Sequence, residues 1–210
     1  MANLKNVNPS LYMPNLLHFL DTIVENDPIV VHAIVEVSSH SINKYELITE
    51  TGHLKLDRVG YSSLSYPFTY GAIPKTYDLD DDPLDIIITN VTEPLIPGSV
   101  VEARVIGLIK FTDGDEVDDK VVAVLAGDKR VDHIKSIQDL GEYWEKETVY
   151  YWEHYKDLKK PGTVKVNGIL GIDEAKKVIE ECMERYETEY LPKLELKDDE
   201  CCCGACGCND

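Results

Sequence analysis

The sequence is poor in basic residues, and this scarcity limits the partners that the protein can bind. It contains 21 lysines and arginines against 39 aspartates and glutamates, which gives a formal net charge of −18. Binding to a nucleic-acid backbone or to an anionic membrane depends on positive charge at the protein surface. We therefore expect neither nucleic acid nor a membrane as a partner. A small anionic substrate would need positive charge gathered locally, from a few placed side chains or from bound cations.

Long apolar runs and cysteines are also scarce in the body of the chain. No apolar stretch approaches the roughly 20 residues of a membrane-spanning helix. The first residues include a single lysine and no unbroken apolar stretch of the kind found in signal peptides, so we expect a cytoplasmic protein. Cys182 is the only cysteine before the last ten residues. No disulfide framework is therefore expected, and the core must be stabilised by packing.

Changes in composition divide the chain into three parts. Residues 1–27 are punctuated by Asn and Pro, and their apolar stretch at 16–24 predicts one helix that ends before Pro28. Residues 28–194 carry the strand and helix patterns of a folded domain. Residues 195–210 are acidic and then cysteine-rich, with little to bury. We expect one domain with an N-terminal extension and a C-terminal tail.

Branched residues and the alternation of polar with apolar side chains predict a series of short strands before residue 127. Turn sequences such as Glu50-Thr51-Gly52 separate them. No helix pattern interrupts the series, which favours an antiparallel barrel or sandwich over a parallel α/β sheet. The predicted strands are residues 29–37, 42–48, 53–57, 84–90, 100–111 and 120–126.

Two helices are expected in the last third of the domain. Ser136 to Asp139 resembles a capping box, and aromatic residues follow at helical spacing as far as Tyr155. The second helix is predicted to begin at an Asp173 cap, with an apolar stripe from Ala175 onward. Both apolar faces are typical of core packing.

Four aspartates lie within the six residues from Asp80 to Asp85, directly before an apolar strand. Like charges this close disfavour one another's ionisation, and a divalent cation removes the conflict. Carboxylate oxygens suit Mg²⁺ or Mn²⁺. A solvated acidic turn is the simpler interpretation, but Pro83 restricts the backbone, and a second acidic segment at 113–119 again lies beside a strand. Two such segments at the ends of neighbouring strands could hold one group of ions.

An EF-hand calcium loop is the competing metal interpretation, because Asp78, Asp80 and Asp82 have its alternate spacing. The sixth position of such a loop would be Pro83, where Gly is required, and the twelfth would be Thr89, where a bidentate Glu is required. The flanking segments also have the pattern of strands. The sequence therefore argues against a calcium loop of this type.

Basic and tyrosine side chains that could bind phosphate recur around the two acidic segments. Lys44 and Glu46, for example, share one face of a predicted strand because side chains alternate. The segment from Asp80 to Ile86 matches the signature of the soluble family I inorganic pyrophosphatases, and the chain resembles that family in order across residues 29–190. The matching residues outside the signature are Glu36, Lys44, Glu46, Arg58, Tyr70, Asp113, Asp118, Lys120, Glu153, Tyr155 and Lys156.

The resemblance implies an α+β fold in which a five-stranded antiparallel OB-like β-barrel is flanked by two main helices. It implies a cytoplasmic inorganic diphosphatase that hydrolyses pyrophosphate to two orthophosphates by a metal-activated water. The implied cofactor is Mg²⁺, with several ions per active site and Mn²⁺ or other divalent ions as possible substitutes. Relatives commonly form homo-oligomers, and a hexamer is favoured.

The resemblance also assigns roles to individual residues. Asp82 is expected to accept the proton of the nucleophilic water. The expected metal ligands are Asp80, Asp85, Asp113, Asp118, Glu36 and Glu46, of which the two glutamates act mainly through waters and neighbouring cations. The expected substrate-binding residues are Lys44, Arg58, Tyr70, Lys120, Tyr155 and Lys156.

Two other functions are compatible with the acidic segments. A divalent-ion or phosphate-binding module is one, although a pure cation sink gains nothing from the basic residues nearby. A hydrolase of larger phosphate esters or nucleotides is the other, although no separate base-stacking or sugar-binding segment is evident. Five cysteines near the C-terminus lie outside the resemblance and predict either a reduced tail or a site for Zn²⁺ or Cu⁺; they are Cys201, Cys202, Cys203, Cys206 and Cys208.

Overall fold

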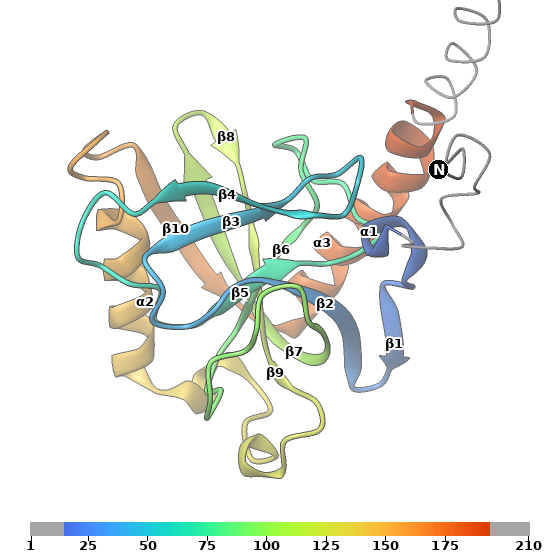
Figure 1. Ribbon diagram of the computed structural model, residues 1–210. Coiled ribbons are helices and arrows are strands. Elements are labelled where there is room, and N and C mark those ends of the chain that lie inside the picture. The colour runs from blue at the N-terminus through green and yellow to red at the C-terminus, as the bar shows by residue number, and fades with distance from the viewer. Residues whose placement is uncertain (1–14, 194–210) are drawn as a thin grey trace, which may run out of the picture.

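Five strands close into a barrel in the computed structural model, which describes residues 15–193 (Figure 1). The ring runs β2–β5–β6–β9–β7 and closes where β7 pairs again with β2. The predicted five-stranded barrel is therefore confirmed, with one difference: β6 and β9 run parallel, whereas the other four pairings are antiparallel. The strands are β2 (Ile29–Val37), β5 (Thr69–Ala72), β6 (Asp85–Ile88), β7 (Val100–Asp113) and β9 (Lys120–Leu125).

The remaining strands extend the barrel or lie over its mouth. β1 (Ile23–Asn26) pairs with β2, while β8 (Glu116–Val117) and β10 (Val164–Leu170) pair with β7. β3 (Asn43–Leu47) and β4 (Leu54–Val59) form a separate hairpin. Its turn needs Gly52, whose φ is +69° and whose missing Cβ would lie 2.7 Å from Oδ1 of Asn15.

Two main helices flank the barrel, as expected. The first, α2 (Glu142–His154), follows a short 3₁₀ helix, η4 (Ile137–Leu140), and the predicted capping box belongs to η4. The second, α3 (Ile172–Arg185), buries the predicted stripe through Ala175, Val178, Ile179 and Cys182. The expected cap at Asp173 is wrong: the N-cap is Gly171, because β10 ends at Leu170 and the chain turns at once into the helix.

The barrel wall is apolar on both sides because each side faces a different hydrophobic cluster. On β6, Ile86 and Ile88 join the cluster that includes α3, whereas Ile87 joins the cluster that includes α2. All three isoleucines are fully buried. This two-sided burial explains why β6 reads as a continuous apolar run rather than as an alternating strand.

The segment before β2 differs from its prediction. The helix expected over 16–24 is limited to α1 (Leu16–Phe19), and β1 follows it. Between them the buried Thr22 hydroxyl donates to the Pro74 carbonyl at 2.8 Å, so residues 15–26 lie against the domain. After α3 the chain continues through η5 (Tyr186–Tyr190). The earlier part of the expected extension and the expected tail, 195–210, lie outside the described residues.

No membrane-spanning helix is found in this part of the chain. Among residues 15–193, no helix combines sufficient length with sufficient apolar character to cross a membrane.

Candidate active site

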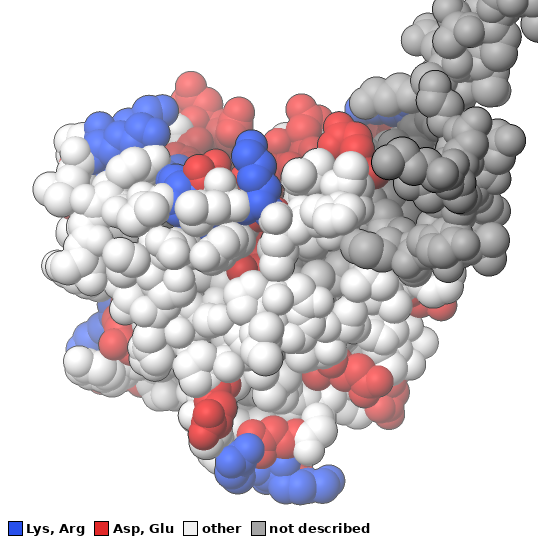
Figure 2. Space-filling model, in the orientation of Figure 1, with Lys and Arg blue, Asp and Glu red and all other residues white. Residues whose placement is uncertain are grey.

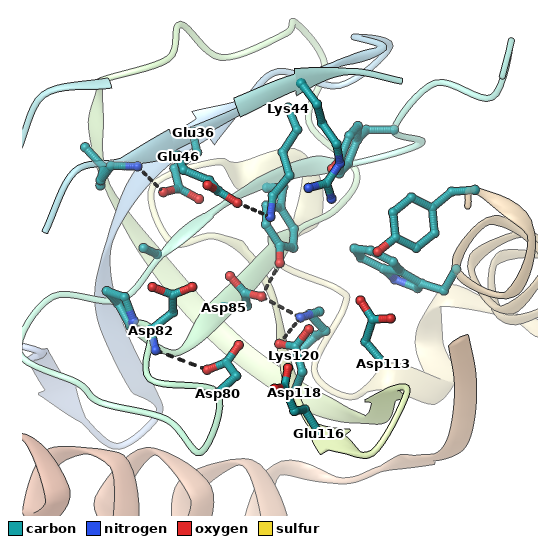
Figure 3. Close-up of a pocket in the computed structure, with 18 of the residues that line it drawn as sticks. Glu36, Lys44, Glu46, Asp80, Asp82, Asp85, Asp113, Glu116, Asp118 and Lys120 are labelled. Atoms are coloured by element: carbon teal, nitrogen blue, oxygen red, sulfur yellow. Dashed lines mark hydrogen bonds and ion pairs between the residues drawn. The ribbon is translucent and has the colours of Figure 1, made fainter. Parts of the chain in front are cut away.

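A cavity of about 250 Å³ lies between one end of the barrel, the β3–β4 hairpin and the C-terminal end of α2. Its lining includes every residue that the sequence analysis selected as a candidate for metal binding, substrate binding or catalysis (Figure 3). These thirteen residues are Glu36, Lys44, Glu46, Arg58, Tyr70, Asp80, Asp82, Asp85, Asp113, Asp118, Lys120, Tyr155 and Lys156. Side chains that are up to 120 positions apart in the sequence thus face one space.

The first acidic segment enters the cavity from the loop between β5 and β6. Asp80 and Asp82 lie on this loop, and the Asp82 amide donates to Oδ1 of Asp80 at 3.3 Å. Asp85 is the first residue of β6. Its neighbours Leu84 and Ile86 are fully buried in the core, so strand alternation turns the Asp85 carboxylate to the opposite side, into the cavity.

The second acidic segment is brought beside the first by the parallel pairing of β6 with β9. In this register Asp85 is the partner of Lys120. The Lys120 ammonium lies between two carboxylates, 2.5 Å from Oδ2 of Asp85 and also ion-paired with Asp118 (Figure 3). Asp113 ends β7, and its carboxylate forms an ion pair with Lys156.

The β3–β4 hairpin supplies two of the cavity's cations. Lys44 and Glu46 share a face of β3, as predicted, and their charged groups are 2.5 Å apart. Arg58 on β4 is the register partner of Lys44, which places the two cations side by side. Below them, the buried Glu36 of β2 accepts a hydrogen bond of 2.8 Å from the Leu47 amide.

Three chemically capable residues of the lining were missed by the sequence analysis. Tyr66 and Trp152 belong to an aromatic cluster on the α2 side of the cavity, with ring centroids 6.3 Å apart. Glu116 lies within the second acidic segment. Nothing in the sequence separated Glu116 from its acidic neighbours, and the two aromatic residues have the spacing expected of core residues. Their position at the cavity is decided by packing.

Acidic side chains outnumber basic ones in the cavity. Eight carboxylates line it, from Glu36, Glu46, Asp80, Asp82, Asp85, Asp113, Glu116 and Asp118, against four cations, from Lys44, Arg58, Lys120 and Lys156. Figure 2 shows charged side chains of both signs gathered at the top of the molecule, the end at which β3 and β4 lie in Figure 1, whereas the middle of that face is largely uncharged.

The excess of negative charge affects the pKa values of the carboxyl groups. Burial, together with the nearby charges of Asp118 and Asp85, raises the pKa of Asp80 to about 8. Burial and the charge of Asp85 also raise the pKa of Glu36 to about 8. For Asp118 burial acts in the same direction, but the Lys120 ammonium outweighs it and lowers the pKa. The site thus favours additional positive charge.

The chemistry of the lining fits divalent metal ions. The donors are carboxylate oxygens, the hard ligands that suit Mg²⁺, and a bound cation would relieve the repulsion that raises the pKa of Asp80. Among residues 15–193, no three acidic, histidine or cysteine side chains are drawn together tightly enough to form a complete ligand set. The positions of the lysines account for this, because Lys120 and Lys156 already form ion pairs with Asp85, Asp118 and Asp113.

Comparisons with known proteins agree with this site. A family model described as inorganic pyrophosphatase matches residues 33–187. The inorganic pyrophosphatase of Geobacillus stearothermophilus is 41% identical over 160 residues, which are 76% of this chain and 96% of that protein. That of Thermus thermophilus is 43% identical over 162 residues, 76% of this chain and 92% of that protein.

A solved structure gives the same result for the fold. The crystal structure of an inorganic pyrophosphatase from Neisseria gonorrhoeae superimposes with a TM-score of 0.78 at 38% identity, covering 82% of this chain and 99% of that one. The five-stranded barrel, the cavity with its two acidic segments, and the extent of these matches lead to one conclusion. The chain belongs to the soluble family I inorganic pyrophosphatases.

Proposed function

We propose that this chain hydrolyses inorganic pyrophosphate to two orthophosphates, with Mg²⁺ as its cofactor. The observation that carries the proposal is the composition of the cavity, in which eight carboxylates and four cations face one space of about 250 Å³. A phosphate-binding module would need the cations alone, and a cation store would need the carboxylates alone. A site that holds both is suited to metal ions and a phosphate anion together.

The carboxylates divide into sets that would hold the ions. Asp80, Asp85 and Asp118 would hold a first ion, with Asp85 shared with a second. Asp113 and Asp118 would hold an ion that accompanies the substrate, and Glu36 and Glu46 would contribute through water and neighbouring cations. When bound, Mg²⁺ lowers the pKa of a coordinated water and neutralises phosphate charge. Mn²⁺ or another divalent ion of similar ligand preference is a possible substitute.

Asp82 is the proposed proton acceptor for the attacking water. It lies on the same loop as Asp80, and its side chain lines the cavity. In the part of the chain that the structure describes, Asp85, Asp113 and Asp118 each form an ion pair with a lysine, whereas Asp82 does not. Compared with those three carboxylates, that of Asp82 is therefore better placed to take a proton from a water held beside it.

The basic and tyrosine side chains would hold the substrate. Lys44, Lys120 and Lys156 would act as point charges, while the planar guanidinium of Arg58 can donate to two phosphate oxygens at once. Tyr70 and Tyr155 would add hydroxyl donors, and Tyr70 already donates to Asp85. These groups offset the charge that develops on the leaving phosphate as the bridging P–O bond breaks.

The protein is proposed to act in the cytoplasm as a homo-oligomer, with a hexamer favoured. Exposed aromatic residues on α2 support self-association, because the side chains of Tyr143 and Tyr150 are 80% and 57% exposed. Tyrosine side chains are enriched at protein interfaces relative to the rest of the surface. Sedimentation equilibrium would measure the oligomeric state directly.

One phosphate-release assay separates the candidate functions. Purified protein would be given pyrophosphate, ATP or a simple phosphate monoester, first with Mg²⁺ and then with EDTA. We expect rapid release from pyrophosphate with Mg²⁺, and little release from the other substrates or after chelation. Equal rates with ATP or the monoester would favour a hydrolase of larger phosphate compounds, and binding without release would favour a storage module.

A further inference from the structure

The loop that carries Asp80 and Asp82 is a short turn, with hydrogen bonds between neighbouring residues such as that from the Asp82 amide to Oδ1 of Asp80. Within the loop, the Asp78 amide donates to the Asp82 carbonyl at 2.8 Å, and the Asp81 amide donates to the Asp78 carbonyl at 3.3 Å. Asp81 adopts a φ of +69°, a conformation that non-glycine residues rarely adopt. Two carboxylates therefore project from a short turn that contains a strained residue, and contacts outside the turn decide how it is oriented relative to the barrel.

The outside support comes from the C-terminal end of α3. Arg185 donates from Nε to the Tyr77 carbonyl and from Nη2 to Oδ1 of Asp78, both at 2.9 Å. One turn earlier, the Cys182 carbonyl accepts a hydrogen bond of 3.0 Å from the Tyr77 amide. Both backbone groups of Tyr77 and the side chain of Asp78 are thus fixed to one helix, which runs along the bottom of Figure 3.

This connection is buried and geometrically restrictive. Asp78 is 5% exposed and Cys182 fully buried, and the Cys182 sulfur lies 3.0 Å from Nη2 of Arg185. A guanidinium presents its donors in one plane, so two hydrogen bonds from it fix a direction as well as a distance. The helix itself is anchored in the core through Ala175 and Ile179, both fully buried. Movement of the loop relative to the barrel would break this set of bonds.

We propose that Arg185 is a positioning residue for the metal site, acting through Tyr77 and Asp78 to set where Asp80 and Asp82 stand. The inference rests on the proposed function, since it assumes that the Asp80 loop binds divalent ions. Arg185 itself does not line the cavity. Its removal should therefore weaken metal binding more than it lowers turnover at saturating metal, because the ligands remain present but are less well organised.

Four variants test the inference. Arg185→Lys keeps the charge but cannot reach both acceptors, so we expect Mn²⁺ binding to weaken about tenfold, the effect of losing one charge-assisted hydrogen bond. Asp78→Ala should behave in the same way. Asp78→Asn removes the same charge as Asp78→Ala but keeps the acceptor oxygen. It should therefore retain most of the wild-type affinity for Mn²⁺. The Asn and Ala pair separates the hydrogen bond from the electrostatic effect of the carboxylate.

Arg104→Lys is the matched control. Arg104 is a buried arginine that donates to two backbone carbonyls, those of Val131 and Ile134, at 3.1 and 2.6 Å. It lies near the opposite end of β7 from Asp113. We expect this variant to lose thermal stability without any change in metal affinity.

The measurement is direct Mn²⁺ binding, from the signal of free Mn²⁺ in electron paramagnetic resonance, alongside thermal unfolding and kcat at saturating Mg²⁺. Wild-type affinity in folded Arg185→Lys, or equal weakening by Asp78→Asn and Asp78→Ala, would overturn the positioning role. Equal weakening by Arg104→Lys would show a general effect of stability and would overturn it as well. Failure of the proposed function would look different, because the wild-type protein itself would then neither bind Mn²⁺ nor release phosphate.

Discussion

Replacing Lys120 by methionine should destabilise the metal-free protein and make its stability depend on divalent ions. The Lys120 side chain is 1% exposed and lies between the carboxylates of Asp85 and Asp118. Methionine preserves most of the packing volume but leaves two largely buried carboxylates facing each other. Breaking a buried ion pair by removing one partner costs about 3–5 kcal/mol, because the remaining charge stays uncompensated.

The structure also predicts how much of the lost stability bound Mg²⁺ can restore. In a domain of this size each kcal/mol shifts the melting temperature by about 2–4 °C, so the loss is about 6–20 °C in EDTA. Saturating Mg²⁺ should return much of it, since a ligand at a hundred times its Kd contributes about 2.7 kcal/mol. The wild-type protein should gain less, because its Lys120 ammonium competes with the ion for Asp85 and Asp118.

The pH dependence of the stability lost in Lys120→Met gives a second check on this explanation. Burial already raises the pKa of Asp85 to about 6 in the presence of Lys120, and loss of the ammonium removes the main opposing influence. A carboxyl whose folded pKa lies above its unfolded value loses stability as the pH rises through the folded value. The deficit of Lys120→Met should therefore be smaller at pH 5 than at pH 8.

Thermal unfolding followed by circular dichroism, with EDTA and with MgCl₂, measures all of these effects. Lys177→Met is the control, because the Lys177–Glu181 pair on α3 is exposed and should contribute little. A melting temperature for Lys120→Met within about 2 °C of wild type in EDTA, with the same gain from Mg²⁺ in both proteins, would refute the reasoning.

Three further predictions follow from the site and its surroundings. Asp85→Asn should lower kcat for pyrophosphate by orders of magnitude while the circular dichroism spectrum is retained. Normal turnover would show that Asp85 is not a metal ligand. Burial lowers the pKa of His18, whose Nε2 lies 2.9 Å from the Thr49 carbonyl, so the contribution of His18 to stability should be present above pH 6.5 and be lost as the pH falls. In chemical denaturation, the free energy of unfolding of His18→Gln should therefore depend less on pH between 6.5 and 5 than that of the wild type. An equal pH dependence in both proteins would contradict this. Deleting residues 195–210 should lower the amount of Zn²⁺ or Cu⁺ bound in equilibrium dialysis and leave kcat unchanged, whereas equal metal content in both proteins would reject a metal-binding tail.

The β pattern of the domain was largely readable because branched residues and alternation are local signals. β2 was predicted with the bounds that the structure shows, and β7 and β9 differ only at their ends. β5 and β10 were missed. β5 has the sequence Thr-Tyr-Gly-Ala, in which Thr and Tyr favour a strand but Gly and Ala do not. Its Gly71 is explained by close packing, since an added Cβ would clash with the Ile34 carbonyl oxygen. Such a contact between strands is invisible in a local window.

The sequence by itself determined the chemistry of this protein: which side chains are acidic, which are basic, and that two acidic segments so close to strands favour divalent ions. Tertiary structure alone decided how these groups meet. The parallel register that pairs Asp85 with Lys120 brings the two segments together, and Arg185, a hundred residues further along the chain, supports the loop of Asp80 and Asp82. Residue type is a local property of the chain, whereas the distance between two charges depends on strand pairing and helix packing, which involve distant residues at once.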